Sequence, residues 1–134
     1  MRIVLDSNVI VAAFAARGLC KDVFALVIED HQLVTSDFIL GESRRILSEK
    51  INLKGNIVSD INNLLKTKGI VVEPEEVEHN ELSDPGDLPI LGTASAGNAR
   101  VILNGDSDLL DIKTYNEIPV YSPRKFWETQ TDRE

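Results

Sequence analysis

Short apolar runs alternate along the chain with longer stretches in which apolar residues recur every three or four positions. The short runs predict buried strands at residues 2–6, 32–35, 70–72, 101–103 and 118–121. The longer stretches predict helices at residues 8–16, 19–30, 37–50, 52–68 and 84–98, one from residue 106 or 107, and a short terminal one ending at residue 127. Strands that alternate with helices are typical of a parallel sheet with helices on both faces. We therefore predict an α/β protein, a three-layer α/β/α fold with a central, mainly parallel sheet.

Three local features refine this arrangement. Pro119 predicts that the last strand lies at a sheet edge, because proline has no N–H to donate to a neighbouring strand. Residues 73–83 are acidic and lack a clear period, so we expect a loop there. The residues from Gly92 to Gly97 are all small, which allows the fifth helix to lie close to the sheet.

Length and composition exclude several classes of protein. The 134 residues most simply form one domain, 1–134, which is long enough to bury a core. The single cysteine, Cys20, excludes an internal disulfide framework. No stretch approaches the roughly 20 apolar residues of a membrane span, and Asp6 interrupts the first apolar run too early for a signal peptide. We expect a cytoplasmic protein with no membrane partner.

The formal net charge of −8 argues against a passive nucleic-acid binder, which would normally be basic. That objection weakens if several acids converge on bound divalent ions, because the ions reverse the local sign of the charge. Charge alone therefore does not decide the class of partner.

Acidic residues directly follow two of the predicted strands. Asp6 ends the first apolar run, and Asp106 and Asp108 follow the run at 101–103. In an open α/β sheet, ligands bind outside the carboxyl ends of the strands. Two strands that deliver carboxylates to one edge suggest a site for a hard cation.

Glu42 is a third candidate, on the predicted helix 37–50. Its helical neighbours Phe38, Ile39 and Ile46 place it at the border of the apolar face. A partly buried carboxylate is costly unless it is paired or bound to a metal. The alternative is an ion pair with Arg45 or Lys50.

Each of the other acids also has a structural explanation. Asp6 could be a solvated loop acid. Asp84 precedes Pro85 as a helix N-cap would, and Asp87 could be the cap instead, but capping hardly explains both. Asp106 could cap the following helix, whose dipole would favour Asp108.

Taken together, these positions resemble the PIN domain, the nuclease fold of many VapC-like toxins. The resemblance covers nearly the whole chain, and four segments in order carry it: 5–9 (Leu-Asp-Ser-Asn-Val), 36–47 with Glu42 at its centre, 84–94 with Asp87, and 104–110 (Asn-Gly-Asp-Ser-Asp-Leu-Leu). No single segment identifies the family, but the four segments in this order and at these spacings are quite specific to it.

The resemblance implies a role for each residue. Asp6, Glu42, Asp87 and Asp106 would be the catalytic, metal-binding acids, and Asp108 an auxiliary metal ligand. Ser7 and Asn8 would support Asp6. Asp84 would lie outside the direct metal ligands or would cap the helix. Asn104 departs from the family, which usually has Thr or Ser there, and this changes the reach of the supporting hydrogen bond.

Carboxylates suit Mg²⁺ or Mn²⁺, which bind through a few acids and substrate phosphate. Neither His31 nor His79 is placed to add an imidazole, so zinc is not expected. By the resemblance, the reaction would be hydrolysis of RNA to 5′-phosphate and 3′-hydroxyl ends by an Mg/Mn-dependent endoribonuclease. Basic residues near Glu42 could bind the RNA backbone or could form a solvated helix face: Arg44, Arg45, Lys50 and Lys54.

The main hypothesis is the toxin of a toxin–antitoxin pair, with an RNA substrate, a possible antitoxin protein partner and a possible homodimer. A second hypothesis, motivated by Asn104, is a catalytically idle PIN-type module that binds a protein or RNA. A third places Asp6 in phosphoryl transfer. It is the weakest, because Asn8 stands where a phosphatase of the haloacid-dehalogenase type needs a second aspartate and no lysine follows residues 101–103 as a receiver domain requires.

Overall fold

The computed structural model describes residues 1–77, 85–105 and 114–131 and contains a six-stranded sheet in the order β3-β2-β1-β4-β6-β5. The four strands β1, β2, β4 and β6 and the short β3 are parallel, whereas β5 runs antiparallel to β6. The strands are β1 (Arg2–Leu5), β2 (Gln32–Thr35), β3 (Ile70–Val71), β4 (Val101–Leu103), β5 (Thr114–Tyr115) and β6 (Ile118–Tyr121). The predicted α/β fold with a mainly parallel sheet is confirmed.

The helices alternate with these strands, as predicted. They are α1 (Ser7–Ala15), α2 (Leu19–Asp30), α3 (Asp37–Glu49), α4 (Gly55–Lys68), the 3₁₀ helix η1 (Pro85–Asp87), α5 (Leu88–Ala96) and α7 (Pro123–Thr131). The helix expected from residue 106 or 107 lies outside the described residues. Within the described ranges, none of the helices is both long and apolar enough to cross a membrane.

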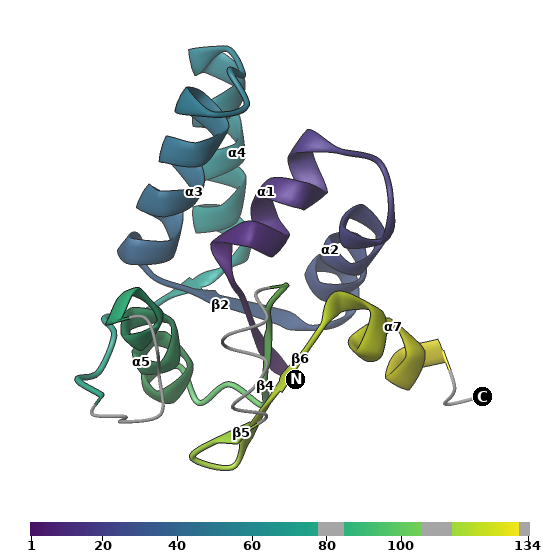
Figure 1. Cartoon of the computed structure of the whole chain (residues 1–134), viewed down its shortest axis with the longest axis vertical. Coiled ribbons are helices and arrows are strands. Elements are labelled where there is room, and N and C mark those ends of the chain that lie inside the picture. Colours follow the sequence, from purple (N-terminus) through teal and green to yellow (C-terminus); the bar gives the residue numbers. More distant parts are fainter. Residues whose placement is uncertain (78–84, 106–113, 132–134) are drawn as a thin grey trace.

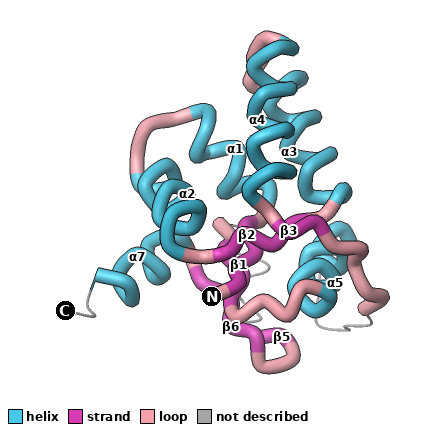
Figure 2. Tube along the Cα trace, turned by 180° about the vertical axis from the view of Figure 1, so that it is seen from behind, coloured by secondary structure: helices cyan, strands magenta, loops and turns pink. Residues whose placement is uncertain are grey.

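Helices cover both faces of the sheet. Figures 1 and 2 show α1, α2, α3 and α4 on one side and α5 on the other. Neighbouring residues of β2 point to opposite sides: Leu33 borders Gly69 at the end of α4, and Val34 borders Gly97 at the end of α5. A Cβ atom at Gly97 would lie only 2.3 Å from Cγ1 of Val34. The predicted close approach of α5 to the sheet is therefore confirmed.

The apolar runs of the central strands form the middle of the core. Every residue of β4 and the last three residues of β1 and of β2 are buried. Helical residues such as Ile10, Val27, Ile39 and Leu91 complete the core from both sides. This packing fixes the carboxyl ends of β1, β2 and β4 relative to one another.

One prediction about the sheet is wrong. The strand that contains Pro119 is not an edge strand, because β5 pairs with its outer side. Asn116 and Glu117 have φ angles of 47° and 68°, which form the tight two-residue turn between β5 and β6. β5 is only two residues long and alternates too briefly to be recognised as a strand.

Several helix boundaries also differ from the prediction. Helix α5 begins at Leu88, after η1, and not at residue 84. Helix α4 begins at Gly55 and not at residue 52, because Asn52 has a φ of 61° that a right-handed helix excludes. Helix α7 continues to Thr131, four residues past the predicted end. The buried Phe126 packs its ring edge-on against His31, at 5.8 Å between centroids, which anchors α7 to the end of α2.

Candidate active site

Asp6 lies at the carboxyl end of the central strand β1, where the chain turns into α1. Connections from β1 and to β4 run to opposite sides of the sheet, so the ends of these two strands form the switch point at which α/β sheets bind ligands. The Asp6 side chain is only 4% exposed, so it is not a solvated loop acid. Its Oδ1 atom accepts a hydrogen bond of 2.6 Å from the backbone N–H of Ser7 and so caps α1.

Ser7 connects this strand end to Glu42. The Ser7 hydroxyl lies 2.5 Å from Oε1 of Glu42 and 3.4 Å from Oδ1 of Asp6. A hydroxyl has one proton to donate, and the shorter distance assigns it to Glu42. Ser7 therefore supports Asp6 mainly through its backbone and Glu42 through its side chain.

Glu42 is half-buried on α3, at the border of the apolar face as predicted. The alternative ion pair with Arg45 does not form, because Nη1 of Arg45 instead lies 3.7 Å from Oε2 of Glu49. Arg44, Arg45, Lys50 and Lys54 are all exposed. Two carboxylates from distant parts of the sequence, Asp6 and Glu42, are thus held on either side of one serine.

Asn104 supports Asp6 from the adjacent strand. It follows β4, is fully buried, and donates from Nδ2 to Oδ2 of Asp6. Its Oδ1 accepts a hydrogen bond of 3.2 Å from Nδ2 of Asn8, and Oδ1 of Asn8 accepts one of 3.2 Å from the backbone N–H of Gly105. Asn8 therefore contacts Asn104 and the backbone after β4, and acts on Asp6 only through them.

Asp87 comes from the opposite side of the sheet, at the start of α5. It is 7% exposed, and its side chain makes no capping hydrogen bond to that helix, so capping does not explain it. The position of α5 is fixed by Thr93, whose hydroxyl lies 2.8 Å from that of Ser36 at the N-cap of α3. Since α3 carries Glu42, this contact sets Asp87 and Glu42 relative to each other.

Two neighbouring acids contribute to an unusual pKa at Asp6. This pKa is raised from 3.8 to about 6, chiefly by burial and further by the charges of Glu42 and Asp87, while the Ser7 hydrogen bonds act to lower it. A carboxylate that is costly to ionise, beside two more carboxylates, is the arrangement that a bound cation relieves.

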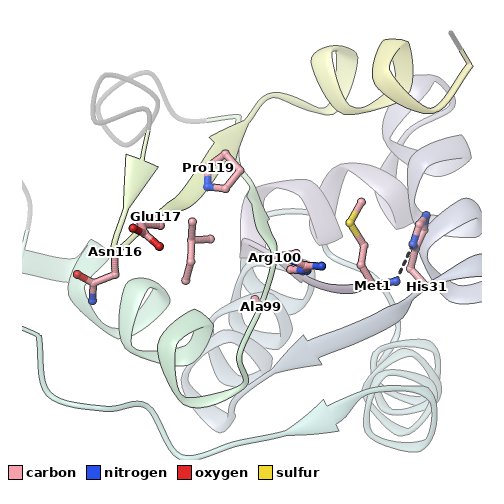
Figure 3. Close-up of a pocket in the computed structure, with 8 residues that line it drawn as sticks. Met1, His31, Ala99, Arg100, Asn116, Glu117 and Pro119 are labelled. Atoms are coloured by element: carbon pink, nitrogen blue, oxygen red, sulfur yellow. Dashed lines mark hydrogen bonds between the residues drawn. The ribbon is translucent and has the colours of Figure 1, made fainter. Parts of the chain in front are cut away.

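One cavity, of about 660 Å³, lies away from this edge. Figure 3 shows it at the amino ends of the strands, lined by residues that include Met1, Ala99, Arg100 and Ile118. Met1 and Arg100 precede β1 and β4, whereas Asp6 and Asn104 follow them. This cavity is therefore separated from the acids by the length of the strands.

A comparison with protein families identifies the family of this chain. The sequence model of one family, described as the PIN domain, matches residues 2–108, a range that includes all four predicted catalytic acids. The chain belongs to the PIN domain family. PIN domains are generally nucleases that depend on a divalent metal ion.

The fold of this PIN domain is also similar to a solved structure. VapBC2 from Rickettsia felis, bound to a DNA fragment from their promoter, matches with a TM-score of 0.61 over 91% of this chain and 98% of that chain. The two sequences are 13% identical, so the similarity concerns the fold. A comparison with curated proteins gives no match.

The donors at this edge of the PIN domain are of the type that Mg²⁺ and Mn²⁺ prefer. Asp6, Glu42 and Asp87 offer carboxylate oxygens. Within residues 1–77, 85–105 and 114–131, however, no group of three His, Cys, Asp or Glu side chains is arranged to hold a metal ion. The predicted ligands Asp106 and Asp108, and the supporting residue Asp84, lie outside the described residues. The donor chemistry of the described acids therefore fits the ion.

Sequence reasoning missed the contacts that hold the acids. It did not identify Thr93 as the residue that joins α5 to α3. It assigned Ser7 and Asn8 to Asp6. Ser7 does bond to Asp6, but the contacts of Ser7 with Glu42 and of Asn8 with Asn104 were not predicted. A threonine within a helix of small, apolar residues was the only signal for the Thr93 contact.

Proposed function

We propose that this PIN domain is a divalent-metal-dependent endoribonuclease that hydrolyses phosphodiester bonds of RNA. Its catalytic acids are Asp6, Glu42, Asp87 and Asp106, with Asp108 as a further metal ligand and Asp84 in support. The observation that carries this proposal is the burial of Asp6 beside two other carboxylates, where its pKa is about 6. A solely structural acid would gain nothing from two like charges in its surroundings.

The residues of the chain hold the reacting groups in place. When bound, Mg²⁺ or Mn²⁺ would supply positive charge that activates a water molecule and stabilises the pentavalent phosphate. Asp6 presents a carboxylate whose two oxygens are fixed by Ser7 and Asn104. Ser7 fixes Oε1 of Glu42, so Oε2 would be the oxygen that serves as a ligand.

The basic residues of α3 support an RNA substrate. Arg44 and Arg45 lie two and three residues after Glu42 on α3 and are exposed, so they can contact phosphates of the substrate. Local positive charge is needed here, since the net charge of −8 otherwise repels RNA.

We further propose that the protein is the toxin of a toxin–antitoxin pair and acts on RNA in the cytoplasm. The support is its PIN fold and the structural similarity to VapBC2. An antitoxin would be the protein partner, and a homodimer is the proposed oligomeric state.

A catalytically idle PIN module that binds RNA or protein is the second candidate. Asn104 in place of Thr or Ser, and the absence of a complete metal cluster among the described acids, favour it. Against it, the side chain of Asn104 donates a hydrogen bond to Asp6, so asparagine in place of Thr or Ser keeps this interaction.

Cleavage of single-stranded RNA with Mn²⁺ separates the two candidates. Wild type should cleave, and Asp6→Asn should be slower by more than about 100-fold, because it removes a ligand rather than a supporting residue. Asp60→Asn, at an exposed position of α4, is the matched control and should retain full activity. Wild type and Asp6→Asn cleaving at the same rate would remove Asp6 from the reaction, and no cleavage by wild type would favour the idle module.

A further inference from the structure

We propose that Asn8 and Asn104 form an amide clasp, a pair of positioning residues that fix the Asp6 carboxylate for metal binding through a chain of three hydrogen bonds. The hydrogen bonds alone support the existence of the clasp. Its effect on metal binding rests on the proposed function. The clasp runs from the backbone N–H of Gly105 to Asn8, from Asn8 to Asn104, and from Asn104 to Asp6.

The direction of every hydrogen bond in the clasp follows from its first donor. A backbone N–H can only donate, so Oδ1 of Asn8 must face Gly105. Nδ2 of Asn8 then faces Oδ1 of Asn104, and this turns Nδ2 of Asn104 toward Oδ2 of Asp6. Reversing either amide would bring two donors or two acceptors together.

The clasp restrains the carboxylate from both ends. Oδ1 of Asp6 is held by the backbone N–H of Ser7 at 2.6 Å, and Oδ2 is held by Asn104. The two donors come from different segments, the start of α1 and the end of β4, so the carboxylate plane cannot turn without breaking one bond. One lone pair on each oxygen remains for a metal ion.

Asparagine at position 104 makes this restraint depend on Asn8. An amide carries its donor and its acceptor on separate atoms, so occupying the acceptor selects the direction of the donor. A serine or threonine hydroxyl rotates and can donate to Asp6 whatever its other neighbour is. The departure at Asn104 therefore gives Asn8, an exposed residue without direct contact to Asp6, a specific role in this chain.

The same contacts connect α1 to the residues that follow β4. Asn8 lies in α1, and Gly105 immediately precedes the proposed ligand Asp106. The bond between them ties the backbone before Asp106 to the helix that Asp6 caps. The clasp thereby couples the carboxylate of Asp6 to the backbone at Gly105, about a hundred residues later in the chain.

A double-mutant cycle on metal affinity tests the clasp. Mn²⁺ binding is measured by calorimetry for wild type, Asn8→Ala, Asn104→Ala and the double variant. Each single substitution should weaken binding by about 10–100-fold, as the loss of a residue that orients a ligand does. Because Asn8 acts through Asn104, the double variant should bind within about 2-fold of Asn104→Ala. Losses that multiply, or an unchanged affinity of Asn8→Ala, would overturn the proposal.

A second measurement needs neither metal nor activity. In the metal-free wild type, the side-chain amide protons of Asn104 should exchange slowly with solvent in NMR spectra, and Asn8→Ala should speed this exchange while leaving the backbone amides of β4 protected. Equal side-chain exchange in both proteins would overturn the clasp even if wild type binds no Mn²⁺, an outcome that would contradict the proposed function alone. Asn63→Ala, on the exposed side of α4, is the matched control and should change neither readout.

Discussion

Asp6 is buried within the fold while both of its carboxylate oxygens accept hydrogen bonds from neighbouring segments. The donors are the backbone of Ser7 and the side chain of Asn104. Such donors lower the pKa of a carboxyl group, yet burial outweighs them and the pKa of Asp6 is about 6. The site thus holds the side chain in position, but its hydrogen bonds do not fully stabilise the negative charge.

This balance predicts how metal binding depends on pH. Mn²⁺ binds the ionised carboxylate, so binding must release the proton that Asp6 holds below about pH 6. The affinity should therefore be about tenfold lower at about pH 5 than at about pH 7.5, and constant above pH 7. Calorimetric titrations at these two values check the expectation. An ordinary aspartate would be ionised at both, so equal affinities would show that Asp6 is not perturbed or is not a ligand.

The sequence was sufficient to predict where individual acids lie, but not which side chains form hydrogen bonds with them. Asp6 follows an apolar strand and Glu42 borders an apolar helix face, so both locations followed from periodicity. Hydrogen-bond partners depend on distances of a few tenths of an ångström across segments 35 to 98 residues apart, which no spacing encodes. The contacts of Ser7 with Glu42 and of Asn8 with Asn104 were therefore not predicted.

At the scale of elements, the segment after β3 is fastened to α5 at Gly92. The backbone N–H of Glu75 donates to the carbonyl oxygen of Gly92 at 3.1 Å, and the Ser95 hydroxyl donates to Oε2 of Glu75 at 2.7 Å. A Cβ atom at Gly92 would lie 2.2 Å from the carbonyl oxygen of Glu75. The contact is between two backbones, so neither side can give way by a change of rotamer.

Gly92→Ala should therefore destabilise the protein by about 1–3 kcal/mol, the usual cost of overpacking. Gly41→Ala is the control, because Gly41 lies within α3 with no atom within 4 Å of the added Cβ. Alanine there should be neutral or stabilise by about 0.5–1 kcal/mol through its higher helix propensity. Urea unfolding of the two variants measures both effects, and equal stabilities would contradict the close packing of this segment on α5.

Some helix and strand boundaries could not be predicted from the spacing of apolar residues. The long helices and central strands bury regular apolar patterns and were predicted closely. The start of α4 and the β5–β6 turn depend on single backbone conformations, at Asn52 and at Asn116 with Glu117. The extension of α7 ends in threonines whose hydroxyls bond back to helix carbonyls, a pattern with no apolar period.

At the scale of the whole molecule, a protein with a net charge of −8 has an unfavourable field for RNA. Three described acids from both halves of the chain, Asp6, Glu42 and Asp87, lie close enough for the charges of the other two to raise the pKa of Asp6. In the proposed function, a metal ion bound by these acids would offset their charge and so favour RNA binding as well. Asp106 and Asp108 are the further ligands of that proposal.

Anomalous diffraction from crystals grown with Mn²⁺ tests this convergence most directly. We expect an anomalous peak at about 2 Å from an oxygen of Asp6, shared with at least one of Glu42, Asp87 and Asp106. Crystals of Asp6→Asn grown in the same way should lack the peak. Manganese bound elsewhere on the molecule, with the oxygens of Asp6 making only their bonds to Ser7 and Asn104, would contradict a metal centre at this edge of the sheet.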